Sequence, residues 1–122
     1  MLRDNVREYA DPDTPPGCLI VLAGIAYSTE TQPLRDLLKK CRDEDRQRLL
    51  GRIRGAMKSG ELPANLDADA LAAFMMTVLY GLSIQARDGA TLQQLESTVD
   101  LAMRTWDDVV TSARRAPDAP RA

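Results

Sequence analysis

The feature that most constrains the fold is the segment from Asp67 to Gly89, which reads DADALAAFMMTVLYGLSIQARDG. Between Ala68 and Leu82 its only charged residue is Asp69, which falls in the first turn of a predicted helix. A helix on the surface of a small protein normally has one apolar stripe and one polar face. Here the middle of the helix has no polar face, so a second cover is needed. We expect that cover to be another copy of the chain.

The length and charge of the chain restrict its class. Its 122 residues suffice for one domain with one core. The net charge of -2 and the isoelectric point of about 5.1 argue against a nucleic-acid surface of its own. No apolar run reaches the roughly 18 residues of a membrane span, and no signal peptide is visible. Two cysteines without a disulfide-dense pattern fit a reducing cytoplasm. We expect a cytoplasmic chain with no membrane contact.

Apolar spacing, capping residues and helix breakers predict five helices and no strand. Asp67 is a good N-cap, and Thr91 with Gln94 predicts a capping box for the last helix. The tail 114–122 is polar and contains prolines, so we expect disorder there and one domain over residues 1–113. The predicted helices cover residues 1–10, 15–28, 31 or 32 to 59, 67–88 and 91–113.

The search for catalytic chemistry is mostly negative. The chain has no histidine, which excludes a Ser-His-Asp triad, a Cys-His pair and a histidine-based metal site. No Gly-rich phosphate-binding loop is present. The nearest approach to a carboxylate in an apolar stripe is Asp45, which we interpret as solvent-facing. We therefore expect no enzyme activity, no catalytic residue, no metal and no cofactor.

The two cysteines, Cys18 and Cys41, allow two interpretations. Both fit small buried hydrophobic residues, which is common for free cysteine. The other hypothesis is a redox-sensing pair bridged across adjacent helices. Basic residues flank Cys41 in sequence, but no run that would stabilise a thiolate is obvious beside either residue. We favour burial as the explanation.

Methionines and tyrosines gather in segments that should face inward: Met57, Met75, Met76, Tyr27 and Tyr80. Methionine adapts to irregular space, and tyrosine offers a polar group on an apolar wall. The pattern fits an adaptable apolar pocket between helices, but residue types alone favour plain core filling.

The order of several short motifs resembles TetR-type transcriptional regulators. The run GCLIVLAG after a DPxxPP loop resembles the start of their effector domain. The link Gly60-Glu61-Leu62-Pro63, followed by Asp67, Ala70-Leu71-Ala72, Phe74 and Gly81-Leu82, is similar to the last two helices of that family. The resemblance covers about residues 2–106.

The resemblance implies an all-α effector-binding and dimerisation domain of a bacterial regulator, with repression as the default. In the family, the last two long helices of each subunit form an intermolecular four-helix bundle, and the preceding helices enclose a pocket for a small, often hydrophobic effector. The implied effector-binding residues are Leu22, Tyr27, Leu38, Cys41, Met57, Met75, Met76, Leu79 and Tyr80. The implied interface of the homodimer contains Phe74, Val78, Gly81, Leu82, Gln85, Leu95, Val99, Ala102, Met103, Trp106 and Val110.

The expected departure from the family is the absence of the N-terminal helix-turn-helix. Nothing before Ala10 supplies a three-helix reader with a basic recognition helix. Operator DNA is then a partner only through the missing helix-turn-helix. The alternative function is a helical interaction module with a filled core and no ligand.

Overall fold

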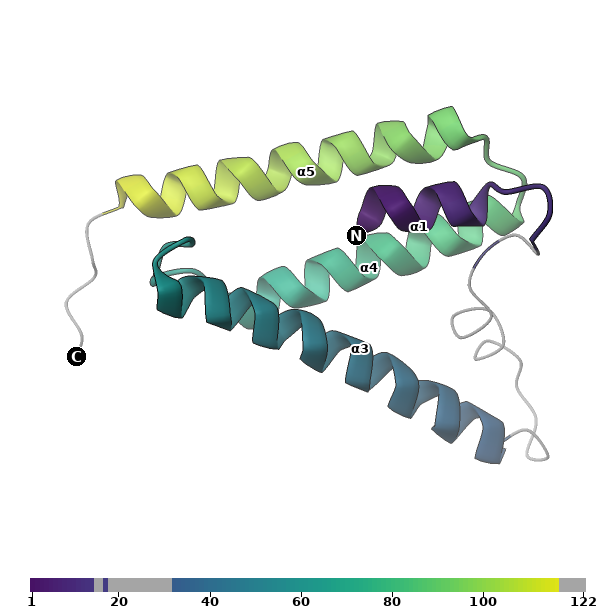
Figure 1. Cartoon of the computed structure of the whole chain (residues 1–122), viewed down its shortest axis with the longest axis horizontal. Coiled ribbons are helices and arrows are strands. Elements are labelled where there is room, and N and C mark those ends of the chain that lie inside the picture. The colour runs from purple at the N-terminus through teal and green to yellow at the C-terminus, as the bar shows by residue number, and fades with distance from the viewer. Residues whose placement is uncertain (15–16, 18–31, 117–122) are drawn as a thin grey trace.

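The computed structural model describes residues 1–14, 17 and 32–116. Within these ranges the protein contains helices and no strand, which confirms the all-α prediction (Figure 1). The helices are α1 (Leu2–Tyr9), α3 (Gln32–Ser59), α4 (Ala68–Arg87) and α5 (Leu92–Arg115). The helix predicted over 15–28 lies outside the described residues. The last helix extends to Arg115, beyond the predicted end at residue 113.

The apolar helix α4 is the centre of the arrangement. It contacts α1, α3 and α5, and α1 also contacts α5. Figure 1 shows α4 and α5 as a hairpin with the short α1 against them, while the C-terminal part of α3 approaches the start of α4. This placement gives α4 neighbours on more than one side, as its composition predicts.

Local hydrogen bonds set the helix boundaries where the sequence predicts them. The carboxylate of Asp67 accepts a hydrogen bond from the backbone N–H of Ala70 at 3.0 Å. Thr91 Oγ1 accepts from the N–H of Gln94 at 3.2 Å, and Gln94 Oε1 accepts from the N–H of Thr91 at 2.8 Å. These bonds satisfy N–H groups that have no partner inside the helix. Both predicted caps are confirmed.

Two apolar clusters form the core. The first joins α1, α4 and α5, and the second joins the C-terminal half of α3 to the start of α4 and the end of α5. The buried members of the first are Leu2, Val6, Tyr9, Met75, Leu82, Ala86, Leu95, Val99 and Ala102. The buried members of the second are Leu50, Ile53, Leu66, Ala68, Leu71, Ala72 and Val110.

Although no uninterrupted apolar run reaches 18 residues, α4 is long and apolar enough to cross a membrane by length and composition alone. This helix has 20 residues, and its most apolar window has a mean hydropathy of 1.3, which meets the requirement by length and composition. Its contacts with three other helices account for part of this composition, since 39% of the window is buried in the single chain.

Candidate functional site

An apolar pocket lies where α1, α3, α4 and α5 converge. Its volume is about 360 Å³, which falls within the usual range for small-molecule sites. Methionine and tryptophan side chains from α4 and α5 line it together with aliphatic side chains from α3. The lining residues are Met1, Leu2, Leu49, Arg52, Ile53, Ala56, Leu62, Met75, Met103 and Trp106.

One charged side chain, that of Arg52, belongs to this lining. Arg52 is exposed, and its guanidinium forms no ion pair with any residue of the described ranges. The neighbouring arginines on α3 differ in this respect. Arg48 Nη1 lies 2.9 Å from Asp45 Oδ1, and Arg54 Nη2 lies 2.9 Å from Asp69 Oδ2. Arg52 therefore brings an uncompensated positive charge to an otherwise apolar wall.

A second pocket of about 220 Å³ lies beside the first, between α1, α3 and α4. Arg52 and Leu49 contribute to both pockets. Asp45 also lines the second pocket, where it is paired with Arg48 and keeps a side-chain exposure of 45%. The position agrees with the interpretation of Asp45 as solvent-facing. The lining consists of Met1, Asn5, Asp45, Arg48, Leu49, Arg52, Met76 and Leu79.

The predicted effector-binding residues are divided between several places. Met75 lines the pocket of about 360 Å³, called the larger pocket because its neighbour measures about 220 Å³. Met76 and Leu79 line that second, smaller pocket. Leu38, Cys41, Met57 and Tyr80 line neither, and Leu22 and Tyr27 lie outside the described residues.

Sequence reasoning missed the part of the lining that comes from α1 and α3. Leu49, Ile53 and Ala56 lie on one face of α3 at helical spacing. That spacing is visible in the sequence, but it is equally typical of a filled core. Leu2 reaches the pocket only because α1 packs across α4 and α5, and such long-range placement has no signal in the local pattern.

Five of the predicted dimer-interface residues are already covered by their own chain. Their exposed fractions range from 0% to 7%, so contact with a second copy would add little burial at these positions. They are Leu82, Leu95, Val99, Ala102 and Val110. Met103 and Trp106 are half-buried and line the larger pocket.

The other predicted interface residues remain accessible on one side of α4. Phe74, Val78 and Gly81 are half-buried, and Gln85 is exposed. A Cβ added to Gly81 would meet no atom within 4 Å. No other helix in the described part of the chain approaches Gly81 closely.

An apolar groove of about 260 Å³ lies on this side of the α4–α5 hairpin. Phe74 from α4 and Val109 from α5 line it, and Trp106 lines both this groove and the larger pocket. Val109 is 40% exposed, and Leu101 on the same helix is 61% exposed. Exposed apolar surface of this kind is typical of an interaction site.

The family of the chain follows from comparison with known proteins. A family model described as the tetracyclin repressor-like C-terminal domain matches residues 1–106. The chain belongs to this family. The TetR-type domain is 28% identical over 102 residues to the HTH-type transcriptional repressor ComR of Escherichia coli (strain K12), which spans 84% of this chain and 49% of ComR.

Solved structures of TetR regulators share the fold. A cysteine mutant of the TetR family regulator CifR, in complex with 26-base-pair operator DNA, is 37% identical with a TM-score of 0.83. That match covers 86% of this chain and 55% of CifR. A TetR-type regulator from Rhodococcus sp. RHA1 is 36% identical with a TM-score of 0.70, over 85% of this chain and 55% of that one. The TetR-type domain thus spans about half the length of these relatives.

Membership of the family decides between an enzyme and a transcriptional regulator. TetR-type proteins are transcriptional regulators and not enzymes, in agreement with the sequence-based prediction. Cys41 is a half-buried free thiol in this domain. Because Cys18 lies outside the described residues, the hypothesis of a bridged cysteine pair stays a prediction.

Proposed function

We propose that this TetR-type domain is the small-molecule-sensing and homodimerisation part of a cytoplasmic transcriptional repressor. The observation that carries the proposal is the 360 Å³ apolar pocket at the junction of all four described helices. A pocket at such a junction responds to occupancy, because a ligand placed between helices changes how they pack. The proposed effector is a small molecule with a hydrophobic body.

The described α1 is the proposed link between effector and DNA. Met1 and Leu2 at its start line the pocket, so an occupant touches α1 directly. In the intact regulator, a helix-turn-helix in the part of the protein that this chain does not span would contact the operator. Movement of α1 would then reposition the helix-turn-helix and release the DNA.

The accessible side of the α4–α5 hairpin is the proposed dimer surface. Phe74, Val78 and Gly81 on α4 lie on the same side as the apolar groove that includes Val109. Covering one large apolar side chain contributes about 1.5–3 kcal/mol. Several such side chains would therefore supply useful association energy to a four-helix bundle of two copies.

Ligand binding can be tested with the native fluorescence of the chain. Trp106 is the single tryptophan and it lines the pocket. Titration with 1-octanol should change its emission in a saturable manner. Ala56→Phe, which places a ring in the pocket, should abolish the change while the helical circular dichroism remains. No saturable change in the unmodified chain would favour the alternative, an interaction module without a ligand.

The oligomeric state is tested separately by light scattering at micromolar concentration. The proposal requires the mass of two chains. A monomer mass would reject homodimerisation by this domain. It would not affect the proposal that the domain binds a small molecule, which the ligand titration tests separately.

A further inference from the structure

The charge at the edge of the apolar pocket indicates which ligands it selects. Arg52 lies between Leu49 and Ile53 on α3, and all three residues line the larger pocket. We propose that the effector is an amphipathic acid, with its hydrophobic body in the pocket and its carboxylate on the Arg52 guanidinium. This inference rests on the proposed function and specifies the chemistry of the same site.

The first argument is the distribution of ion pairs along α3. Arg48 and Arg54, on either side of Arg52 in sequence, each have a carboxylate partner at 2.9 Å. Arg52 has no such partner among the described residues. A guanidinium presents several N–H donors in a planar fork that matches a carboxylate. Arg52 is exposed, so water hydrates its guanidinium in the absence of a ligand, and a ligand carboxylate would take the place of that water.

The second argument is the sign of the charges around the pocket. None of the described residues lining the larger pocket is acidic. The one acidic residue of the neighbouring pocket, Asp45, is already paired with Arg48. An anion at Arg52 would meet little repulsion from this lining, whereas a cationic ligand would meet an unbalanced positive charge.

The third argument is geometric. Arg52 belongs to the walls of both pockets, so its side chain stands at their common edge. An apolar tail can occupy the larger pocket while its head group stays beside the exposed guanidinium, close to water. This arrangement avoids burial of the carboxylate, which would be costly without a partner. The apolar lining also disfavours a ligand with charges at both ends, because the second charge would lie inside the pocket without a partner.

The test compares two probes with the same tail length, octanoate and 1-octanol, at neutral pH. Binding is followed by Trp106 emission and by calorimetry. We expect octanoate to bind about tenfold more tightly than 1-octanol, the ratio that corresponds to one modest charge-assisted interaction. In Arg52→Gln, the affinity for octanoate should fall to that for 1-octanol, while 1-octanol should bind as before.

Arg46→Gln is the matched control. Arg46 is an exposed arginine on the same helix that lines neither pocket, and its substitution removes the same net charge. It should preserve the preference for octanoate. Loss of the preference in Arg46→Gln to the same extent as in Arg52→Gln would indicate a general charge effect and overturn the assignment of Arg52.

The remaining outcomes separate this inference from the proposed function. Equal affinity of the unmodified chain for both probes would overturn the acidic-ligand assignment and leave an apolar sensor pocket. An equal loss of affinity for both probes in Arg52→Gln would likewise overturn the acidic-ligand assignment. Binding of neither probe to the unmodified chain, or binding that survives Ala56→Phe, would reject the pocket itself and the inference with it.

Discussion

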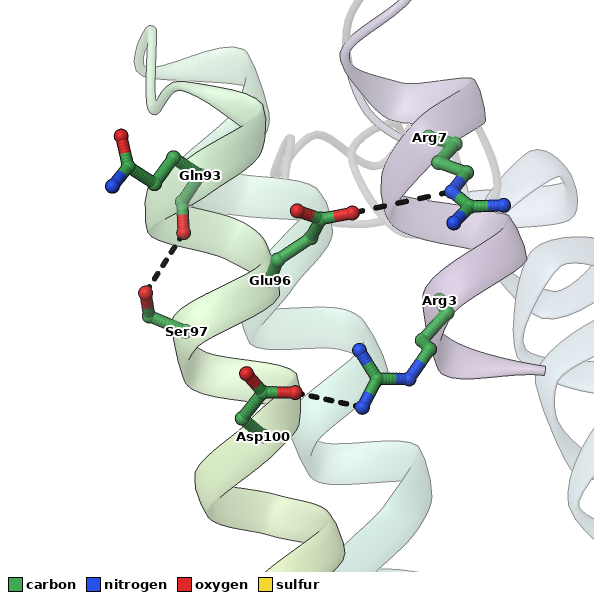
Figure 2. A network of polar contacts seen from close by, with 6 residues as sticks. All are labelled: Arg3, Arg7, Gln93, Glu96, Ser97 and Asp100. Carbon is green, nitrogen blue, oxygen red and sulfur yellow. Dashed lines mark hydrogen bonds and ion pairs between the residues drawn. The ribbon is translucent and has the colours of Figure 1, made fainter.

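Arg3 and Asp100 connect the first and last described helices through a hydrogen-bonded ion pair. Arg3 Nη2 donates to Asp100 Oδ1 at 2.7 Å, although the residues are 97 positions apart in sequence (Figure 2). One turn further along α1, Arg7 Nε lies 4.0 Å from Glu96 Oε1. The order of the partners shows that α1 and α5 run antiparallel, with the two pairs one helical turn apart.

Removal of the Arg3–Asp100 pair should weaken the fold only slightly. Both side chains are about half exposed, and exposed ion pairs contribute at most about 1 kcal/mol. Asp100→Asn should lower the free energy of unfolding in urea by less than about 1 kcal/mol, with a smaller effect at high salt. A decrease of several kcal/mol in the free energy of unfolding would show that this ion pair is buried and not exposed.

Leu82→Glu should unfold the chain rather than merely separate two copies. Leu82 is 1% exposed and packs in the cluster that joins α1, α4 and α5. A carboxylate there would be buried without a partner, which costs several kcal/mol. Circular dichroism should show loss of helix at room temperature. If the variant instead remains folded as a monomer, Leu82 lies at the surface between the two copies.

Val109→Glu is the informative variant for the dimer. Val109 is 40% exposed in the single chain and lines the outer groove. The glutamate can remain in water in a monomer, so helix content should be retained, whereas a dimer contact would be lost. Light scattering should report the mass of one chain. An unchanged dimer would exclude this groove from the interface.

Gly81→Ala separates the stability of the single chain from that of the dimer. In the single chain there is space for the added methyl group, and Gly81 has no positive φ. The substitution should stabilise the helix by about 0.5–1 kcal/mol. If a second copy approaches at Gly81, the same substitution should raise the dissociation constant of the dimer. Urea unfolding and a dilution series measure the two effects separately.

The pH dependence of Asp43 should follow its contact with Lys39. The hydrogen bond from Lys39 Nζ to Asp43 Oδ2, at 2.6 Å, lowers the pKa of Asp43 below its ordinary value of 3.8. A lowered pKa in the folded state favours folding above the ordinary value, and this contribution is lost as pH falls through the lower one. In Lys39→Gln, the midpoint for Asp43 measured by NMR should move up toward 3.8.

Local patterns in the sequence were sufficient to locate the starts of α4 and α5. Asp67 and Thr91 cap α4 and α5 through hydrogen bonds to residues three positions away. Such bonds depend on the adjacent chain alone, so sequence reasoning located them correctly. The order of motifs also placed the chain in the TetR family, which the match over residues 1–106 confirms.

The tertiary structure decided which side of each helix is covered, and by what. The sequence shows that α4 needs cover on several sides, but Leu82 and Phe74 look alike in its apolar pattern. Leu82 is buried because α1 and α5 pack over it, while Phe74 lines the outer groove. The larger pocket likewise combines Leu2, Arg52 and Trp106 from distant segments. Periodicity describes one helix at a time, whereas burial and pocket walls arise from the packing of several helices.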